Sequence, residues 1–139
     1  MYKRIMVPVD LTDKNASALA IAAKFARQNR GRVILVHVIE TVRNIPLREM
    51  KNFYKRLEKG AKQKMTALAN RLDEEEIPVE QEIIFGNRTE EIVKYADENR
   101  IDLIILSSHK VNPDHPGEGW GTISHKVAVL SNRPVLLVK

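Results

Sequence analysis

Short apolar segments alternate with longer amphipathic segments along the whole chain. Four of the apolar segments are continuous aliphatic and β-branched runs, which is typical of strands buried on both faces of a parallel sheet. These four are Arg4–Val9, Val33–Ile39, Leu103–Leu106 and Pro134–Val138. A fifth segment, Val79–Phe85, alternates between apolar and polar residues and is predicted to be an edge strand.

The intervals between these strands carry apolar residues at a helical period. They predict helices over Ala16–Gln28, Arg48–Asp73, Arg88–Asn99 and Thr122–Leu130. The predicted buried face of the longest helix consists of Leu57, Ala61, Met65, Leu68 and Leu72. In the last helix, the residues predicted to point inward are Ile123, Val127 and Leu130.

The regular alternation of strands and helices predicts an α/β fold with a parallel sheet. We expect one doubly wound domain over residues 1–139, with a five-stranded sheet and helices on both faces. A strand order of 3-2-1-4-5 would bring the ends of the first and fourth strands together where the winding reverses. Open α/β sheets bind their ligands at that point.

Composition places the chain among ordinary globular proteins, with 43% apolar and 29% charged residues among 139. No apolar run approaches the roughly 20 residues that cross a bilayer, and the N-terminal residues lack the pattern of a signal peptide. We therefore expect a cytoplasmic protein with no membrane partner. The absence of cysteine excludes disulfides, thiol catalysis and cysteine-bound metals.

Charge is distributed unevenly. Residues 1–71 contain 16 basic and 5 acidic residues, whereas residues 72–139 contain 7 basic and 13 acidic ones. Because the basic excess is concentrated in one stretch, nucleic acid is not the expected partner. A positive stripe at helical spacing is formed by Arg48, Lys51, Lys55, Lys59 and Lys62. This stripe is either a solvated helix face or a docking surface for an unknown protein partner.

The first strand ends in a carboxylate, Asp10, directly after Pro8 and Val9. This carboxylate could accept a hydrogen bond from a ribose hydroxyl, hold a metal through water, or cap the next helix. His37, on an apolar strand, is interpreted as a hydrogen-bonded structural histidine.

The long polar segment 107–122 follows the fourth strand, and loops of this length in a compact domain are commonly functional. Gly117, Gly119 and Gly121 would allow backbone N–H groups to approach an anion closely. Gly121 and Thr122 also open a helix, whose N-terminus favours a phosphate group. The alternative interpretation is a loop that is merely flexible.

No pattern predicts a catalytic group or a metal site. Ser107-Ser108-His109 lacks the flanking glycines of a nucleophile elbow. His109 and His115 with Asp114 are too few and too loosely spaced to define a metal site.

Several segments together resemble a known family over essentially the whole chain. They are Ile5–Asp10, Val36–Val38, Gly86-Asn87 before Glu91–Val93, Asp102–Leu106 and Pro134–Val138. Their order and spacing are similar to those of the universal stress protein family. ATP-binding members carry Gly-x2-Gly-x9-Gly-[Ser/Thr] after the fourth strand. Here Ser107 and Lys110 take the places of the first two glycines, and ten residues separate Lys110 from Gly121.

The resemblance implies an adenine-nucleotide site. By position, Pro8, Asp10 and Val38 would line the adenine and ribose, and Ser107 and His109 would lie near the sugar or phosphates. The complete predicted site is Pro8, Val9, Asp10, Val38, Leu106, Ser107, His109, Lys110, Gly119, Gly121, Thr122 and Ile123. The side chains at 107 and 110 could block the triphosphate, or Lys110 could supply a cation to it. The expected ligand is thus ATP, with or without Mg²⁺, or none.

The resemblance also implies a regulatory homodimer that responds to bound nucleotide in the stress response, with at most slow ATP hydrolysis. Its dimer contact would be the last strand, Val135, Leu136, Leu137 and Val138, which could equally be buried within the monomer. The alternative function is a nucleotide-free interaction protein that docks through the basic stripe.

Overall fold

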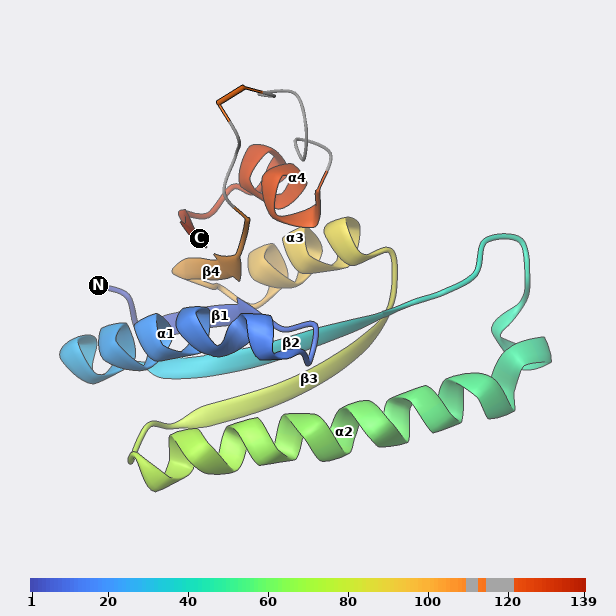
Figure 1. Cartoon of the computed structure of the whole chain (residues 1–139), viewed down its shortest axis with the longest axis horizontal. Helices are drawn as coiled ribbons and strands as arrows, with labels where there is room; N and C mark the ends of the chain where they lie inside the picture. Colours follow the sequence, from blue (N-terminus) through green and yellow to red (C-terminus); the bar gives the residue numbers. More distant parts are fainter. Residues whose placement is uncertain (110–112, 115–121) are drawn as a thin grey trace.

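The computed structural model describes residues 1–109, 113–114 and 122–139 (Figure 1). The strands are β1 (Arg4–Pro8), β2 (Arg32–Glu40), β3 (Val79–Gly86), β4 (Leu103–Ser107) and β5 (Val135–Val138). The helices are α1 (Ala16–Asn29), α2 (Lys51–Glu74), α3 (Arg88–Glu98) and α4 (Ile123–Leu130). Two 3₁₀ turns, η1 (Asp13–Asn15) and η2 (Leu47–Met50), precede α1 and α2.

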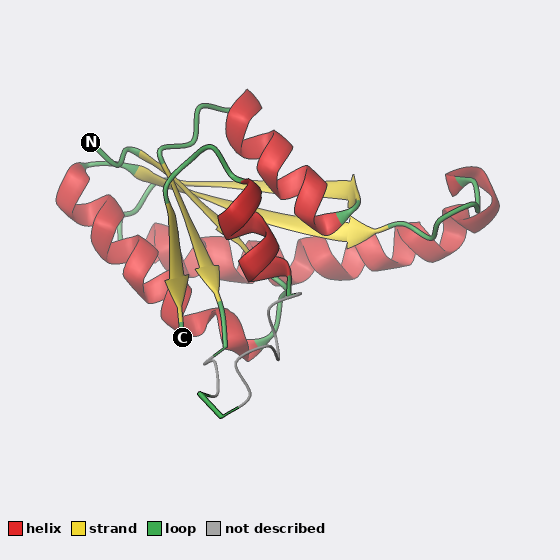
Figure 2. Ribbon diagram, turned by 90° about the horizontal axis from the view of Figure 1, so that it is seen from above, coloured by secondary structure: helices red, strands yellow, loops and turns green. Residues whose placement is uncertain are grey.

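All five strands are parallel, and their order is β3-β2-β1-β4-β5. This confirms the predicted α/β class and strand order. The winding reverses between β1 and β4, which lie side by side in the middle of the sheet. Because every strand runs the same way, the carboxyl ends of all five lie on the same side of the sheet. Figure 2 shows the strands diverging toward that side.

Helices cover both faces of the sheet, as predicted. Alternate side chains of a strand point to opposite faces. Ile5 and Val7 of β1 therefore belong to the core under α1 and α2, whereas Met6 belongs to the core under α3 and α4. Figure 1 shows α2 and the pair α3 and α4 on opposite sides of the sheet.

Two predicted core positions are wrong. Leu57 is 41% exposed, and the buried position in that part of α2 is Tyr54 instead. The Tyr54 ring packs on Phe85, and its hydroxyl accepts a hydrogen bond from the Val42 N–H at 2.8 Å. Leu130, the last residue of α4, is 58% exposed. Leu130 lies at a helix end, where fewer neighbours are available to cover a side chain, whereas at Leu57 the packing of Tyr54 against Phe85 decides which face of α2 is buried.

Among the described residues, no helix has both the length and the apolar character that crossing a membrane requires.

Candidate functional site

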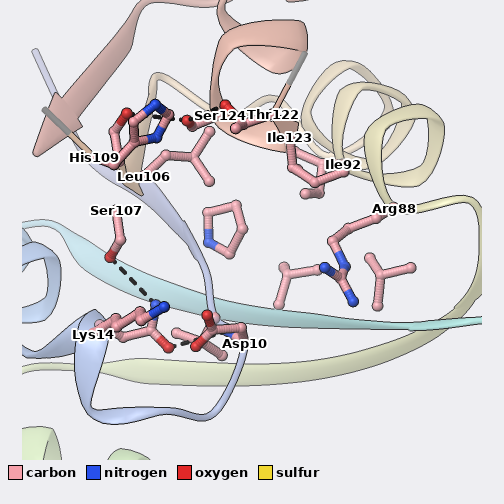
Figure 3. A pocket seen from close by; sticks show the side chains of 16 residues that line it. Asp10, Lys14, Arg88, Ile92, Leu106, Ser107, His109, Thr122, Ile123 and Ser124 are labelled. Atoms are coloured by element: carbon pink, nitrogen blue, oxygen red, sulfur yellow. Dashed lines mark hydrogen bonds between the residues drawn. The ribbon is translucent and has the colours of Figure 1, made fainter. Parts of the chain in front are cut away.

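A cavity of about 630 Å³ opens at the reversal point of the sheet, beyond the carboxyl ends of β1 and β4. The starts of α3 and α4 close its other sides (Figure 3). We call it the switch-point cavity. It is lined by Pro8, Val9, Asp10, Lys14, Asn15, Val36, Val38, Arg88, Ile92, Leu106, Ser107, Ser108, His109, Thr122, Ile123 and Ser124.

Nine of the residues predicted for the nucleotide site line this one cavity. They are Pro8, Val9, Asp10, Val38, Leu106, Ser107, His109, Thr122 and Ile123. They come from β1, β2, β4 and the segment that opens α4, which are far apart in the sequence. The other three predicted residues, Lys110, Gly119 and Gly121, lie outside the described residues, as do Gly117 and His115. That these residues bind a nucleotide stays a prediction.

The end of β1 is held in place by a buried asparagine that the sequence analysis did not single out. The Asn15 Oδ1 atom accepts hydrogen bonds from the backbone N–H groups of Asp10 and Leu11, at 3.0 and 3.2 Å. Its Nδ2 atom donates to the Ser107 hydroxyl at 3.3 Å. One side chain therefore connects the ends of β1 and β4 across the reversal point.

Asp10 does not cap the next helix, because Thr12 is the N-cap residue of η1 and Asn15 is that of α1. The Asp10 Oδ1 atom accepts from both the backbone N–H and the hydroxyl of Thr12, at 2.9 and 2.6 Å. These bonds close the turn that leads into η1 and α1. The Asp10 side chain remains exposed at the rim of the switch-point cavity, within reach of a ligand.

Hydroxyl groups gather where α4 begins. The Ser124 hydroxyl, which is buried, lies 3.1 Å from the Ser108 hydroxyl and 3.3 Å from the Thr122 hydroxyl. Thr122 also bonds Nδ1 of His125 at 2.7 Å, and the His125 ring lies 5.3 Å from the ring of His109. Together with the first N–H groups of α4, these hydroxyls form a rim of donors suited to an anion.

Two cations on the cavity wall escaped the sequence analysis. Lys14 lies in the turn after β1, and Arg88 is the first residue of α3, two positions after β3 ends. The signal that could have found Arg88 is its position, because residues directly after a parallel strand lie at its carboxyl edge. Lys14 lies in the η1 turn, further from the end of β1, and carries no such signal. Ser108, the residue after β4, could have been found in the same way.

The remaining wall is apolar, formed by Pro8, Val9, Val36, Val38, Ile92, Leu106 and Ile123. An apolar wall with a few polar groups at its rim is the usual design of a small-molecule pocket. Such a cavity can hold a flat, weakly polar ring against its wall and an anionic group at its rim.

His37 has the structural role predicted for it. Its Nδ1 atom lies 2.7 Å from the carbonyl oxygen of Val9. Because a carbonyl can only accept, Nδ1 carries the proton and donates it. Among residues 1–109, 113–114 and 122–139, no cluster of three or more histidine or acidic side chains could hold a metal ion.

The comparisons with known proteins all point to one family. The model of the universal stress protein family matches residues 1–139. The universal stress protein MJ0577 of Methanocaldococcus jannaschii is 32% identical to this chain, over 100% of this chain and 96% of that protein. A solved structure of MJ0577 superposes with a TM-score of 0.82, again over 100% of this chain and 96% of that one.

More distant structures share the fold. A universal stress protein of Archaeoglobus fulgidus, solved in complex with dAMP, is 21% identical over 99% of this chain and 98% of that one, with a TM-score of 0.72. A universal stress protein solved in complex with cAMP is 18% identical over 99% and 96% of the two chains, with a TM-score of 0.71. On the family match over its whole length, this chain belongs to the universal stress protein family.

Proposed function

We propose that this protein binds an adenine nucleotide in the switch-point cavity and acts in the cytoplasm as a nucleotide-responsive regulatory homodimer. The observation that carries the proposal is the convergence of nine predicted residues, from separate segments, on one cavity with an apolar wall and a polar rim. The cavity volume of about 630 Å³ is within the usual range of ligand pockets, roughly 300–1,000 Å³.

The ligand class follows from the chemistry of the cavity. The adenine ring would lie against Val38 and Leu106, both of which are buried at the wall. The phosphates would lie at the hydroxyls of Thr122 and Ser124, at the start of α4. Two more distant relatives have been solved with adenine nucleotides, one with dAMP and one with cAMP. ATP, with or without Mg²⁺, is the ligand that we propose for this chain.

A regulatory role is proposed in place of an enzymatic one. Among the described residues that line the cavity, Asp10 is engaged by Thr12 and Ser107 is engaged by Asn15. Neither is paired with a base in the way that an activated nucleophile is. Slow hydrolysis of bound ATP is the most activity that we expect.

The proposal is tested by identifying small molecules released from the denatured protein, followed by calorimetric titration with ATP, ADP and AMP, with and without Mg²⁺. Val38→Phe should fill the cavity and weaken binding by about tenfold or more, since a bulky ring would occupy the place of the base. Val42→Phe makes the same chemical change at a position that is 45% exposed and outside the cavity, and should bind as the unaltered protein does.

Absence of released nucleotide together with absence of binding heat would overturn the proposal. The second candidate function would then take its place, a nucleotide-free interaction protein. It is favoured by the exposure of all five residues of the basic stripe, Arg48, Lys51, Lys55, Lys59 and Lys62.

A further inference from the structure

A second, smaller cavity of about 360 Å³ lies beside the switch-point cavity, between α2 and the ends of β1 and β2. We call it the α2 cavity. Its lining residues are Asp10, Leu11, His37, Val38, Ile39, Glu40, Arg56, Leu57, Gly60, Ala61, Lys64 and Arg88. Gly60 leaves free space on the α2 side of this cavity, because no atom lies within 4 Å of the place where a Cβ at Gly60 would be.

The α2 cavity has an excess of positive charge. Three cations line it, Arg56, Lys64 and Arg88, together with the two carboxylates of Asp10 and Glu40. Both carboxylates are engaged, because Asp10 accepts from Thr12 and Glu40 lies 3.7 Å from the Arg88 guanidinium. Arg56 and Lys64 take part in no ion pair with the described residues. They are therefore available to an anionic ligand.

The two cavities share three lining residues, Asp10, Val38 and Arg88. Figure 3 shows Arg88 on the opposite side of the switch-point cavity from His109 and Ser107. The donors at the start of α4 and the cations of the α2 cavity thus line two neighbouring cavities with a shared boundary. A ligand that occupies both cavities would carry one anionic group at the α4 donors and another beside Arg56 and Lys64.

We propose that the preferred ligand is an adenine dinucleotide, whose second phosphate-bearing part occupies the α2 cavity and is held by Arg56 and Lys64. This inference rests on the proposed nucleotide site and extends it. A mononucleotide would fill the switch-point cavity alone and leave both α2 cations in water. A dinucleotide would make the same contacts and add charge-assisted hydrogen bonds at the second end.

The test compares affinities for AMP and ATP with those for the linear dinucleotide pApA and a cyclic adenine dinucleotide by calorimetry, because both dinucleotides carry two separate phosphate groups. The unaltered protein should bind at least one dinucleotide about tenfold or more tightly than either AMP or ATP. The double variant Arg56→Gln, Lys64→Gln should lose that advantage and bind AMP unchanged, since neither residue lines the switch-point cavity.

The matched control is Lys55→Gln, Lys62→Gln, which removes the same charge from exposed positions of α2 outside the α2 cavity. This control should keep the dinucleotide advantage. Equal affinity for dinucleotides and for AMP or ATP would overturn the inference while leaving the proposed function intact. So would a dinucleotide advantage that falls equally in both double variants, because that result would indicate a general effect of charge. Failure of every nucleotide to bind would overturn the proposed function itself.

Discussion

At the scale of single residues, Asn15 does more for the site than any residue recognised from the sequence. It is 3% exposed, and its side chain satisfies two backbone N–H groups after β1 while donating to Ser107 after β4. Buried polar groups that lose their partners cost free energy, so this position is sensitive to truncation. The same bonds set the position of Asp10 at the cavity rim.

Asn15→Ala should lower the free energy of unfolding by about 1–3 kcal/mol, because it leaves the N–H groups of Asp10 and Leu11 without their acceptor. Nucleotide affinity should fall as well, since the turn that carries Asp10 loses its anchor. Urea unfolding and calorimetric titration measure the two effects. Asn70→Ala, at an exposed position of α2, is the control and should stay within about 0.5 kcal/mol. Equal stability of the two variants would contradict the role given to Asn15.

At the scale of elements, the reversal from α1 into β2 depends on a close backbone approach at Gly31. The left-handed residue of this turn is Arg30, with φ of 53°, so the glycine is not needed there for its backbone freedom. It is needed for space. A Cβ at Gly31 would lie 2.7 Å from the Lys3 carbonyl oxygen and 2.9 Å from that of Tyr2, where β1 begins.

Gly31→Ala should therefore destabilise the protein by about 1–3 kcal/mol, because backbone atoms must move to admit the methyl group. Gly60→Ala makes the same change in the middle of α2, where nothing lies within 4 Å of the new carbon. It should stabilise the protein by about 0.5–1 kcal/mol, since alanine loses less conformational entropy than glycine in a helix. Denaturant midpoints of the two variants should thus move in opposite directions, and a shift of the same sign would refute the steric argument.

At the scale of the whole molecule, the two edges of the sheet differ. The exposed residues Glu80, Gln81 and Glu82 of the edge strand β3 oppose pairing with another strand. The other edge strand, β5, is entirely apolar, and no strand among the described residues pairs with its outer side. Val129 and Leu130 of the adjacent α4 are 82% and 58% exposed. We propose the β5 edge as the homodimer contact.

The backbone of β5 shows which groups would make that contact. The carbonyl oxygens of Pro134 and Val138 accept from the N–H groups of Ile104 and Ser108, at 2.9 and 2.7 Å. Since successive residues of a strand direct their N–H and C=O groups to alternate sides, those of Val135 and Leu137 point away from β4. They are the groups free to pair with a second copy.

Leu137→Pro should give a monomer, because proline removes an outward N–H group while the bonds between β4 and β5 remain. Leu137→Ala shortens the same side chain, keeps the N–H group and should remain a dimer. Sedimentation equilibrium measures the mass of each. A monomeric unaltered protein, or a Leu137→Pro variant that stays dimeric, would exclude this interface.

The sequence alone determined the fold class, the strand order and the family. These depend on the order and periodicity of long segments, and continuous apolar runs such as Val33–Ile39 require a sheet with helices on both faces. Sequence periodicity could not decide the buried face of α2 at its N-terminal end. Tyr54 and Leu57 are both compatible with a helical repeat through Ala61, and packing against Phe85 selects Tyr54.

The tertiary structure decided which groups share the site. Nine of the residues that line the cavity could be named beforehand, most of them by position from the resemblance to the universal stress protein family. The convergence of strand ends in a parallel sheet pointed by itself only to Asp10 and the segment 107–122. Asn15 and Lys14 could not be named, since their relation to Ser107 and Val38 depends on contacts between segments distant along the chain. The α2 cavity could likewise not be predicted from the sequence, where Arg56 and Lys64 are two of many basic residues in one helix. Only the position of α2 against the ends of β1 and β2 brings these two cations to a cavity that borders the switch-point cavity.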